Sequence, residues 1–506
     1  MKSVTVIGAG ISGISLAIKL EKHGIPYVIY EKSQNIGGVW NEANGKVNRF
    51  SKVQSFASSY KMEDDFSHYT EFTPGPQMME KIRDSVKKFK IDEKIRYQHE
   101  LIDFEYLSET KKVSFRVKNL KSNEIETVET DALYIRTGTL NIRNELHFKG
   151  EDKFPGVIQY GSGDNKDEID FQDKEVVIVG MGATAIENAA NALEKGAKKV
   201  RFIVRKLRPI WGKKTIYRML CGAINPLNYL LNSSRIKTWK DINQSYETIV
   251  NYLGNETLNK ITDASTVKIN GNFNHKVSGV PTLNNNFFIF LHYDLIEVIQ
   301  DEIDSCEESE AFMITKKGDR YPADILLKCT GSRMDDSVLK GHLLTDYVFV
   351  DRVPFITHNC GIDRLVSKFH ILGPDSSINM IPLVSYPLIN QVLDELAIYY
   401  LTREDKFNNF LNYRTFFTGP VMVSVDDLDF RSYFYLYWKI LKYVISHPWE
   451  WQLVKRLGTV FINMIRDVRR NLSEERFHEI DKDSWNTLSR WCHGKRPDRP
   501  YLEYPF

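Results

Sequence analysis

Two glycine-rich turns constrain the fold of this chain more than any other feature. The first is Gly8-Ala-Gly10-Ile-Ser-Gly13, and it follows the apolar run Val4-Thr-Val-Ile. The second is Gly180-Met-Gly182-Ala-Thr-Ala185, and it follows Val176-Val-Ile-Val. Each turn leads into an amphipathic helical pattern and then into another apolar strand. One such turn is weak evidence, but two in this context predict two dinucleotide-binding units.

The residue types of these turns suit a bound pyrophosphate. The first glycine permits a tight bend from strand to helix, the second lets phosphate approach the backbone, and the third position must be small. The helix then directs its unpaired N–H groups and positive dipole end at the phosphates. The expected contact positions are Gly8, Gly10, Ile11, Ser12 and Gly13 in the first turn, and Gly180, Gly182, Ala183 and Thr184 in the second.

The two units differ at the tip of the strand that follows each helix. The first strand ends in Glu31-Lys32, and a carboxylate there accepts hydrogen bonds from a ribose diol and repels a 2′-phosphate. The second ends in Arg205-Lys206, which would attract a 2′-phosphate. The sequence therefore predicts a dinucleotide with an unmodified ribose in the first unit and NADPH in the second. The alternative is that one turn is an ordinary strand-to-helix connection without a ligand.

A second internal repeat bounds both units. Asp131-Ala-Leu-Tyr-Ile-Arg-Thr137-Gly138 and Asp324-Ile-Leu-Leu-Lys-Cys-Thr330-Gly331 share the same spacing from Asp to Thr-Gly. Each is expected to be a buried strand whose final Thr-Gly passes close to a cofactor. Gly37-Gly38-Val39-Trp40 is a further turn expected near the first cofactor. Helical periodicity covers 76–89, and a hairpin-like pattern covers 111–123.

The order of these segments predicts a nested domain organisation. Residues 1–150 form the first part of one domain, and 151–335 form the second nucleotide domain, with an irregular insertion at about 207–290. The chain then returns to the first domain over 336–400, with Ile371-Leu-Gly373-Pro374 to Ile381-Pro-Leu383 as the expected return segment and a helix from about Leu388. Residues 401–506 form a mainly helical C-terminal region.

Composition agrees with a cytoplasmic enzyme. A formal net charge of +2 with dispersed basic residues gives no reason to expect a nucleic-acid partner. The five cysteines have no CxxC or metal-ligand spacing, so we expect reduced thiols, no metal and no dithiol redox centre. The N-terminus lacks the basic region of a signal peptide, and no apolar stretch is long enough to span a membrane.

The ordered set of motifs resembles the single-component (class B) flavin-dependent monooxygenases over about residues 1–400. This group includes heteroatom-oxidising, N-hydroxylating and Baeyer–Villiger enzymes. The resemblance implies an α/β fold with two Rossmann-like dinucleotide-binding domains of the three-layer ββα/βα type, the NADPH domain being inserted in the FAD domain. It implies FAD on the first turn, Glu31 and Lys32, with Gly38, Val39, Trp40, Thr137 and Gly138 nearby, and NADPH on the second turn, Arg205, Lys206, Thr330 and Gly331.

The resemblance also implies a mechanism. NADPH reduces FAD, and the reduced flavin reacts with O₂ to a C4a-(hydro)peroxyflavin that passes one oxygen atom to a small organic substrate. The cofactor supplies the oxidising power and the protein supplies orientation and exclusion of water, so no catalytic triad is required. The sequence leaves the substrate and the oligomeric state open.

One motif departs from the family pattern. These proteins usually carry FxGxxxHxxx(Y/F/W) between the two nucleotide motifs. Here Phe154 and Gly156 match, but Tyr160 stands in place of the histidine and Asp164 in place of the aromatic residue. A tyrosine hydroxyl can donate a hydrogen bond but carries no imidazolium charge. Tyr160 is therefore a candidate catalytic residue, and the alternative is an aromatic residue of the linker.

Two segments point to different branches of the family. His275 to Asn285, with Pro281-Thr-Leu-Asn284-Asn285, favours heteroatom oxygenation at nitrogen or sulfur. Lys206-Leu-Arg-Pro209-Ile-Trp211 favours Baeyer–Villiger oxygenation of a ketone. The same cofactor motifs are also compatible with a flavin reductase that does not oxygenate and with a catalytically silent flavoprotein.

The C-terminal region lies outside the resemblance. Residues 430–445 are strongly aromatic, and five basic residues follow by 470. This composition suits a helix that covers the substrate cavity or packs onto the flavin domain. The alternative is peripheral contact with a membrane surface through 430–470.

Overall fold

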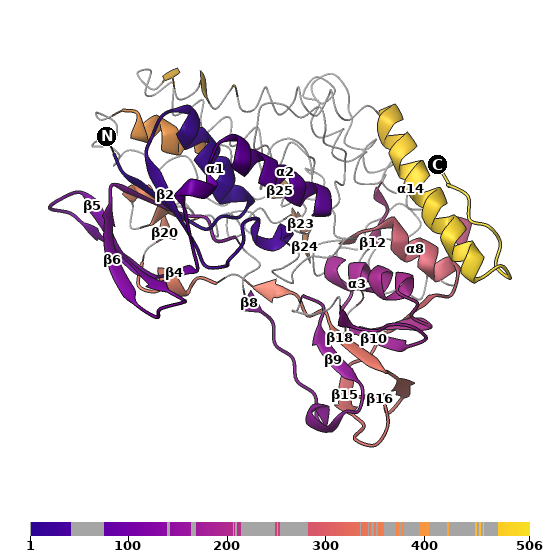
Figure 1. Ribbon diagram of the computed structural model, residues 1–506. Helices are drawn as coiled ribbons and strands as arrows, with labels where there is room; N and C mark the ends of the chain where they lie inside the picture. The colour runs from indigo at the N-terminus through magenta and orange to yellow at the C-terminus, as the bar shows by residue number, and fades with distance from the viewer. Residues whose placement is uncertain are drawn as a thin grey trace.

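The computed structural model describes residues 2–41, 75–138, 142–162, 168–205, 282–333, 335–342, 394–403 and 474–506, with shorter pieces between 207 and 253, between 344 and 378, and between 423 and 459. Two sheets form its centre, each built around one glycine turn (Figure 1). The first unit comprises β1 (Val4–Ile7), α1 (Ile11–Lys22) and β2 (Tyr27–Glu31). The second comprises β10 (Glu175–Val179), α3 (Ala183–Glu194) and β11 (Lys199–Ile203). Both predicted units are present.

The first sheet has seven strands in the order β20-β21-β22-β7-β1-β2-β3. Strand β7 (Ala132–Ile135) pairs in parallel with β1, and β3 (Ile95–Tyr97) pairs in parallel with β2. Beyond β7 lie β22 (Val353–His358), β21 (Phe349–Val350) and β20 (Leu344–Thr345). The predicted strand before Thr137 therefore lies next to the strand of the first glycine turn.

The second sheet has five parallel strands in the order β14-β11-β10-β18-β9. Its outer strands are β14 (Ile296–Ile299) and β9 (Val157–Tyr160), and β18 (Ile325–Lys328) pairs with β10. The strand before Thr330 thus occupies the same place beside β10 that β7 occupies beside β1. All residues of β1, β7 and β18 and the three central residues of β10 are buried, and most of them are apolar, as expected for parallel strands covered on both faces.

The second unit is inserted in the first, as predicted. The chain leaves the first sheet after β7 and crosses through β8 (Ile142–Arg143), and it comes back through β19 (Ser332–Arg333), which pairs with β8 in antiparallel fashion. Figure 1 shows β8 between the two groups of elements.

The strand that rejoins the first sheet lies within the predicted return range 336–400 but before the expected return segment 371–383. The strand that rejoins the first sheet is β22, which pairs with β7. Strand β23 (Ile371–Gly373), at the start of the expected return segment, pairs with β24 (Ser376–Ile378) and β25 (Val423–Ser424). Residues 381–383 and 388 lie outside the described part, and helical residues appear at 394–401. The exact domain boundaries remain predictions.

Smaller elements flank both units. The predicted helix is α2 (Gly75–Lys88). The range 111–123, predicted to be hairpin-like, contains one strand, β5 (Lys112–Asn119), and the turn after it, and β5 pairs with β4 (His99–Leu107) and β6 (Ile125–Thr130) in an antiparallel sheet. The second unit carries β15 (Ile303–Cys306), β16 (Phe312–Thr315) and β17 (Arg320–Pro322). Two short strands, β12 (Ile210–Trp211) and β13 (Thr282–Leu283), lie in the predicted irregular insertion, and the 3₁₀ turns are Gly38–Trp40, Asp92–Lys94, Glu151–Lys153 and Ser337–Leu339.

The described C-terminal helix packs on the second unit. Helix α14 (Glu474–Lys495) lies against α8 (Asn285–His292) (Figure 1). Leu502 near the C-terminus bonds to both helices. Its carbonyl accepts hydrogen bonds from Trp485 Nε1 and Ser489 Oγ of α14, and its N–H donates to the hydroxyl of Tyr293, which follows α8. The segment 430–470 lies almost wholly outside the described residues. Within the described part of the chain, no helix has the length and apolar character that a membrane span requires.

Candidate functional site

The two glycine turns have matching backbone conformations. Gly8 has φ +104° and Gly180 has φ +109°, a region that is strained for residues with a Cβ atom. Gly138 and Gly331, which follow the neighbouring strands, both have φ +79°. The sequence repeat is therefore also a repeat of backbone shape.

Helices α1 and α3 begin directly at the turns. Gly10 and Gly182 precede them in extended conformation, with ψ of 179° and −177°. Among the described residues, no side chain caps the N-terminus of either helix. The first N–H groups of a helix have no acceptor within it, so these ends present donors and a positive dipole to an anion. This arrangement binds phosphate groups in proteins.

The third position distinguishes the two turns. A Cβ atom added to Gly13 would lie 1.9 Å from the carbonyl oxygen of Gly8, so α1 packs on the turn too closely for a side chain. The equivalent Ala185 is buried, and its methyl group is accommodated. The first turn thus requires glycine, whereas the second tolerates alanine.

A cavity of about 670 Å³ lies at the carboxyl ends of β1 and β2, a volume within the range of sites for large ligands. It gathers every residue predicted for the first cofactor except Gly13, which supports the turn from behind. These lining residues are Gly8, Gly10, Ile11, Ser12, Glu31, Lys32, Gly38, Val39, Trp40, Thr137 and Gly138. Residues separated in sequence by more than a hundred positions are therefore brought to one site.

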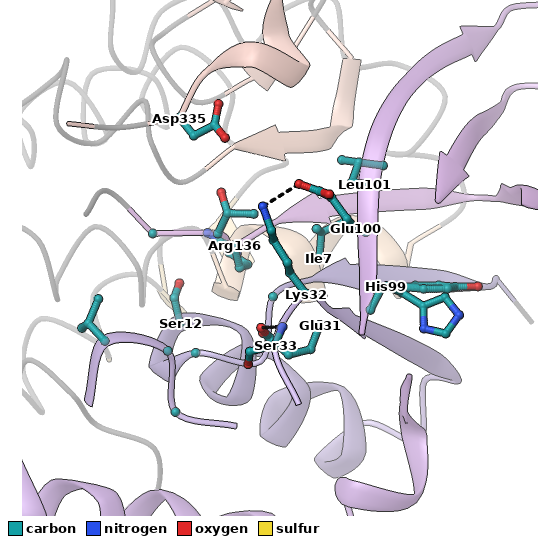
Figure 2. A pocket seen from close by; sticks show the side chains of 18 of the residues that line it. Ile7, Ser12, Glu31, Lys32, Ser33, His99, Glu100, Leu101, Arg136 and Asp335 are labelled. Atoms are coloured by element: carbon teal, nitrogen blue, oxygen red, sulfur yellow. Dashed lines mark hydrogen bonds and ion pairs between the residues drawn. The ribbon is translucent and has the colours of Figure 1, made fainter. Parts of the chain in front are cut away.

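Glu31 is held at the tip of β2 by the backbone. Its Oε2 accepts a hydrogen bond from the N–H of Ala9 at 2.6 Å, and its Oε1 accepts one from the N–H of Ser33 at 2.8 Å (Figure 2). Each carboxylate oxygen keeps a lone pair for a further donor. Gly10 and Gly38 face each other across the turn, since a Cβ on Gly38 would lie 3.2 Å from the Gly10 Cα. A carboxylate beside a glycine-lined cradle fits the ribose and pyrophosphate of FAD.

Part of the cavity wall was not predicted from the sequence. His99, Glu100 and Leu101 come from β4, and Asp335 and Val338 come from the segment after β19. In Figure 2, Asp335 lies on the far side of the cavity from Glu31. No local motif marks these residues, because they reach the cavity only through tertiary packing.

Charges of both signs surround the outer end of the cavity. Lys32 Nζ lies 2.6 Å from Glu100 Oε1 (Figure 2). Burial alone would raise the pKa of Asp335, but hydrogen bonds from Ser337 and the nearby Lys32 and Arg333 outweigh it and hold that pKa below its ordinary value. The carboxylate of Asp335 is therefore an anion at neutral pH.

A buried ion pair adjoins the cavity, and one of its members, Arg136, is among the residues that line it. Arg136 and Asp394 are both inaccessible to solvent, and Arg136 Nη2 lies 3.2 Å from Asp394 Oδ1. Asp394 Oδ2 also accepts a hydrogen bond from Ser15 of α1 at 2.9 Å. Burial raises the pKa of Asp394, and Arg136 opposes that shift. The pair ties β7, α1 and helical residues 394–401 together behind the glycine turn.

Most of the residues predicted to bind the second cofactor belong to the described part of the second unit. A Cβ on Gly180 would lie 2.4 Å from the Cys329 carbonyl oxygen, whereas one on Gly182 would meet nothing within 4 Å. The turn is therefore closely packed against the backbone at Gly180 and leaves space beside Gly182, where a pyrophosphate could approach the backbone. Ala183 and Thr184 form the first turn of α3, and Arg205 is exposed just beyond β11. Lys206 lies outside the described residues.

Thr330, Gly331 and Tyr160 contact the crossing segment between the two units. Thr330 Oγ1 donates to the Asn144 carbonyl at 2.5 Å, and the Gly331 carbonyl accepts from the Asn144 N–H at 3.1 Å. The Tyr160 hydroxyl accepts from the Leu146 N–H at 3.0 Å and donates to the Leu146 carbonyl at 3.2 Å. Tyr160 is not among the residues that line the cavity at β1 and β2. Its catalytic role remains a prediction, because a purely structural role would account for these contacts equally well.

Comparisons with known proteins agree with the geometry. A family model described as flavin-binding monooxygenase-like matches residues 1–345. FAD-containing monooxygenase EthA of Mycobacterium tuberculosis is 25% identical over 209 residues, which cover 40% of this chain and 41% of that protein. Trimethylamine monooxygenase of Methylocella silvestris is 25% identical over 230 residues, covering 40% of this chain and 51% of that protein. The matched region thus spans only about half of these relatives or less.

Solved structures share the fold. A steroid monooxygenase bound to NADP aligns with a TM-score of 0.55 at 16% identity, covering 79% of this chain and 86% of that one. Tmm from Pelagibacter sp. strain HTCC7211 aligns with a TM-score of 0.52 at 16% identity, covering 96% of this chain and 93% of that one. At this level of identity, the likeness establishes the two-domain architecture.

Proposed function

Because the chain belongs to the flavin-binding monooxygenase-like family, we propose that it is an FAD- and NADPH-dependent monooxygenase. The observation that carries this proposal is the cavity around Glu31, which joins the first glycine turn, Gly38–Trp40 and Thr137-Gly138. The chemistry that bound FAD would supply there is two-electron transfer between NADPH and O₂, in which NADPH becomes NADP⁺, one oxygen atom enters a small organic substrate and the other leaves as water.

The residues of the first unit would bind and orient the flavin dinucleotide. Glu31 would accept hydrogen bonds from the ribose hydroxyls, and the N-terminus of α1 would bind the pyrophosphate. His99 and Leu101 of β4 and Val338 of the segment after β19 would cover the cofactor and limit its contact with water. Exclusion of water prevents hydrolysis of reactive intermediates and the leakage of protons.

In the second unit, Arg205 is proposed to bind the 2′-phosphate of NADPH. Replacing Arg205 by Ala should raise the KM for NADPH by about 10- to 100-fold, because hydrogen bonds to charged groups contribute roughly 1.5–3 kcal/mol. The KM for NADH should change little. Steady-state kinetics with both nucleotides measure this difference, and Arg116→Ala removes a surface arginine of β5 as the control. An equal loss for NADH and NADPH would refute the assigned role.

For the substrate class, we propose oxygenation at nitrogen or sulfur, and Baeyer–Villiger oxygenation of a ketone is the alternative. The two segments that favoured different branches lie together in the structure, since Ile210 pairs with Thr282 and Trp211 with Leu283. The similarity to trimethylamine monooxygenase supports the first choice. Incubation with NADPH and O₂ distinguishes them: an amine oxide or sulfoxide supports heteroatom oxygenation, and an ester or lactone from a ketone supports the alternative.

A further inference from the structure

The segment that joins the two nucleotide-binding units is fixed by a buried lysine. Lys328, the last residue of β18, is only 2% exposed. Its Nζ lies 2.5 Å from Glu151 Oε1 and donates to the Leu146 carbonyl at 2.6 Å. Both partners belong to the crossing segment 142–151, so one side chain of the second sheet binds this segment at two points.

Tyr160 binds the same segment from the neighbouring strand. Strands β9 and β18 pair in register, with Tyr160 opposite Lys328. The Tyr160 hydroxyl holds the N–H and the carbonyl of Leu146, and the ring lies 5.2 Å from Lys328 Nζ and 4.0 Å from the Arg143 guanidinium. Tyr160 thus connects the edge strand of the second sheet to the same segment that Lys328 holds.

The other end of the crossing segment reaches the flavin cavity. Ile142 lines that cavity, and β8 is paired with β19, which carries the chain back to the first unit. Movement of the segment relative to the second sheet would therefore change where the flavin cavity lies relative to the second glycine turn. With both cofactors bound, the distance between them would change with this placement.

We propose that Lys328, together with Glu151 and Tyr160, is a positioning group that sets the approach of the nicotinamide to the flavin. This inference rests on the proposed function, in which a hydride with its two electrons passes from NADPH, which becomes NADP⁺, to FAD, which becomes reduced. Lys328 touches neither reacting group in this assignment. It acts by holding the crossing segment in place.

The test compares Lys328→Met, which keeps the length of the side chain and removes its charge, with Lys153→Met. Lys153 forms an ion pair with Glu308 at the surface, 62% exposed, and serves as the matched control. With FAD loaded, Lys328→Met should slow anaerobic reduction by NADPH by about 10- to 100-fold, since a displacement on the order of 1 Å can cost a factor of 100. Binding of NADP⁺, bound FAD and reduction by dithionite should stay as in the native protein.

A second readout does not depend on bound cofactor. In the protein without added cofactor, hydrogen–deuterium exchange of peptides from 142–151 should accelerate in Lys328→Met and not in Lys153→Met. Tyr160→Phe, which retains the ring, should give the same changes to a smaller extent and covers the case in which Lys328→Met fails to fold. Unchanged reduction and unchanged exchange in folded variants would overturn the proposal. A native protein that NADPH cannot reduce would instead contradict the proposed function, and the exchange experiment would then still show whether Lys328 holds the segment 142–151 in place.

Discussion

Replacing Gly13 by Ala is expected to abolish retention of FAD during purification. The added methyl group would lie 1.9 Å from the Gly8 carbonyl oxygen, which is backbone and cannot move aside alone. Helix α1 must then shift away from the turn, and its N-terminus withdraws from the pyrophosphate. Because 1.4 kcal/mol corresponds to a factor of ten in affinity, overpacking of about 3 kcal/mol should weaken FAD binding by about 100-fold. Titration of the cofactor-depleted protein with FAD measures this loss.

Two substitutions control for the change of residue type. Ala185→Gly alters the equivalent position of the second turn and should leave FAD binding intact. Gly494→Ala lies in α14, where a Cβ meets nothing within 4 Å, and should slightly stabilise that helix. If Gly13→Ala binds FAD as tightly as the native protein does, FAD binding does not require α1 to pack closely on the turn.

Replacing Asp394 by Ala should lower the free energy of unfolding by about 3–5 kcal/mol, because it leaves the guanidinium of Arg136 buried without its counter-ion. Both side chains are inaccessible to solvent, so water cannot replace the lost carboxylate. Because the pair ties β7 to α1, the loss should appear in the flavin-binding unit. Urea unfolding followed by the CD signal measures the change in stability.

Two comparisons isolate the buried charge as the cause. The double variant Arg136→Met with Asp394→Leu should be less destabilised than Asp394→Ala, since no uncompensated charge remains. Asp103→Ala breaks an aspartate–arginine pair at the surface with Arg116 and should cost less than about 1 kcal/mol. Equal losses for the buried and the surface pair would show that burial does not make Asp394 important.

The local parts of the site follow from the sequence because their chemistry is local. A strand, a glycine turn and a helix N-terminus occupy a short stretch, so Gly8, Gly10 and Glu31 can be expected from the sequence to lie together, and all three line one cavity. The repeated Asp-to-Thr-Gly spacing predicted two equivalent strands. The structure confirms them, because β7 lies beside β1 as β18 lies beside β10.

The features that the sequence did not predict depend on long-range packing. Strand β22 and not β23 rejoins the first sheet, and the residues of a short strand carry no signal of the strand with which it pairs. His99 and Asp335 reach the cavity from elements with no cofactor motif. Arg136 and Asp394 are 258 residues apart in the sequence, and neither residue alone signals a buried pair.

The central claim, that this protein is an oxygenase, is tested most directly by mixing its reduced FAD form with O₂ in the presence of NADP⁺. Stopped-flow absorbance would follow the return of oxidised flavin while an electrode follows the consumption of O₂. We expect O₂ to disappear well before oxidised flavin returns, and an added amine or sulfide to shorten the delay and become oxygenated. Simultaneous O₂ loss and flavin oxidation with stoichiometric release of H₂O₂, whether or not such a substrate is present, would contradict an oxygenase function and indicate a reductase.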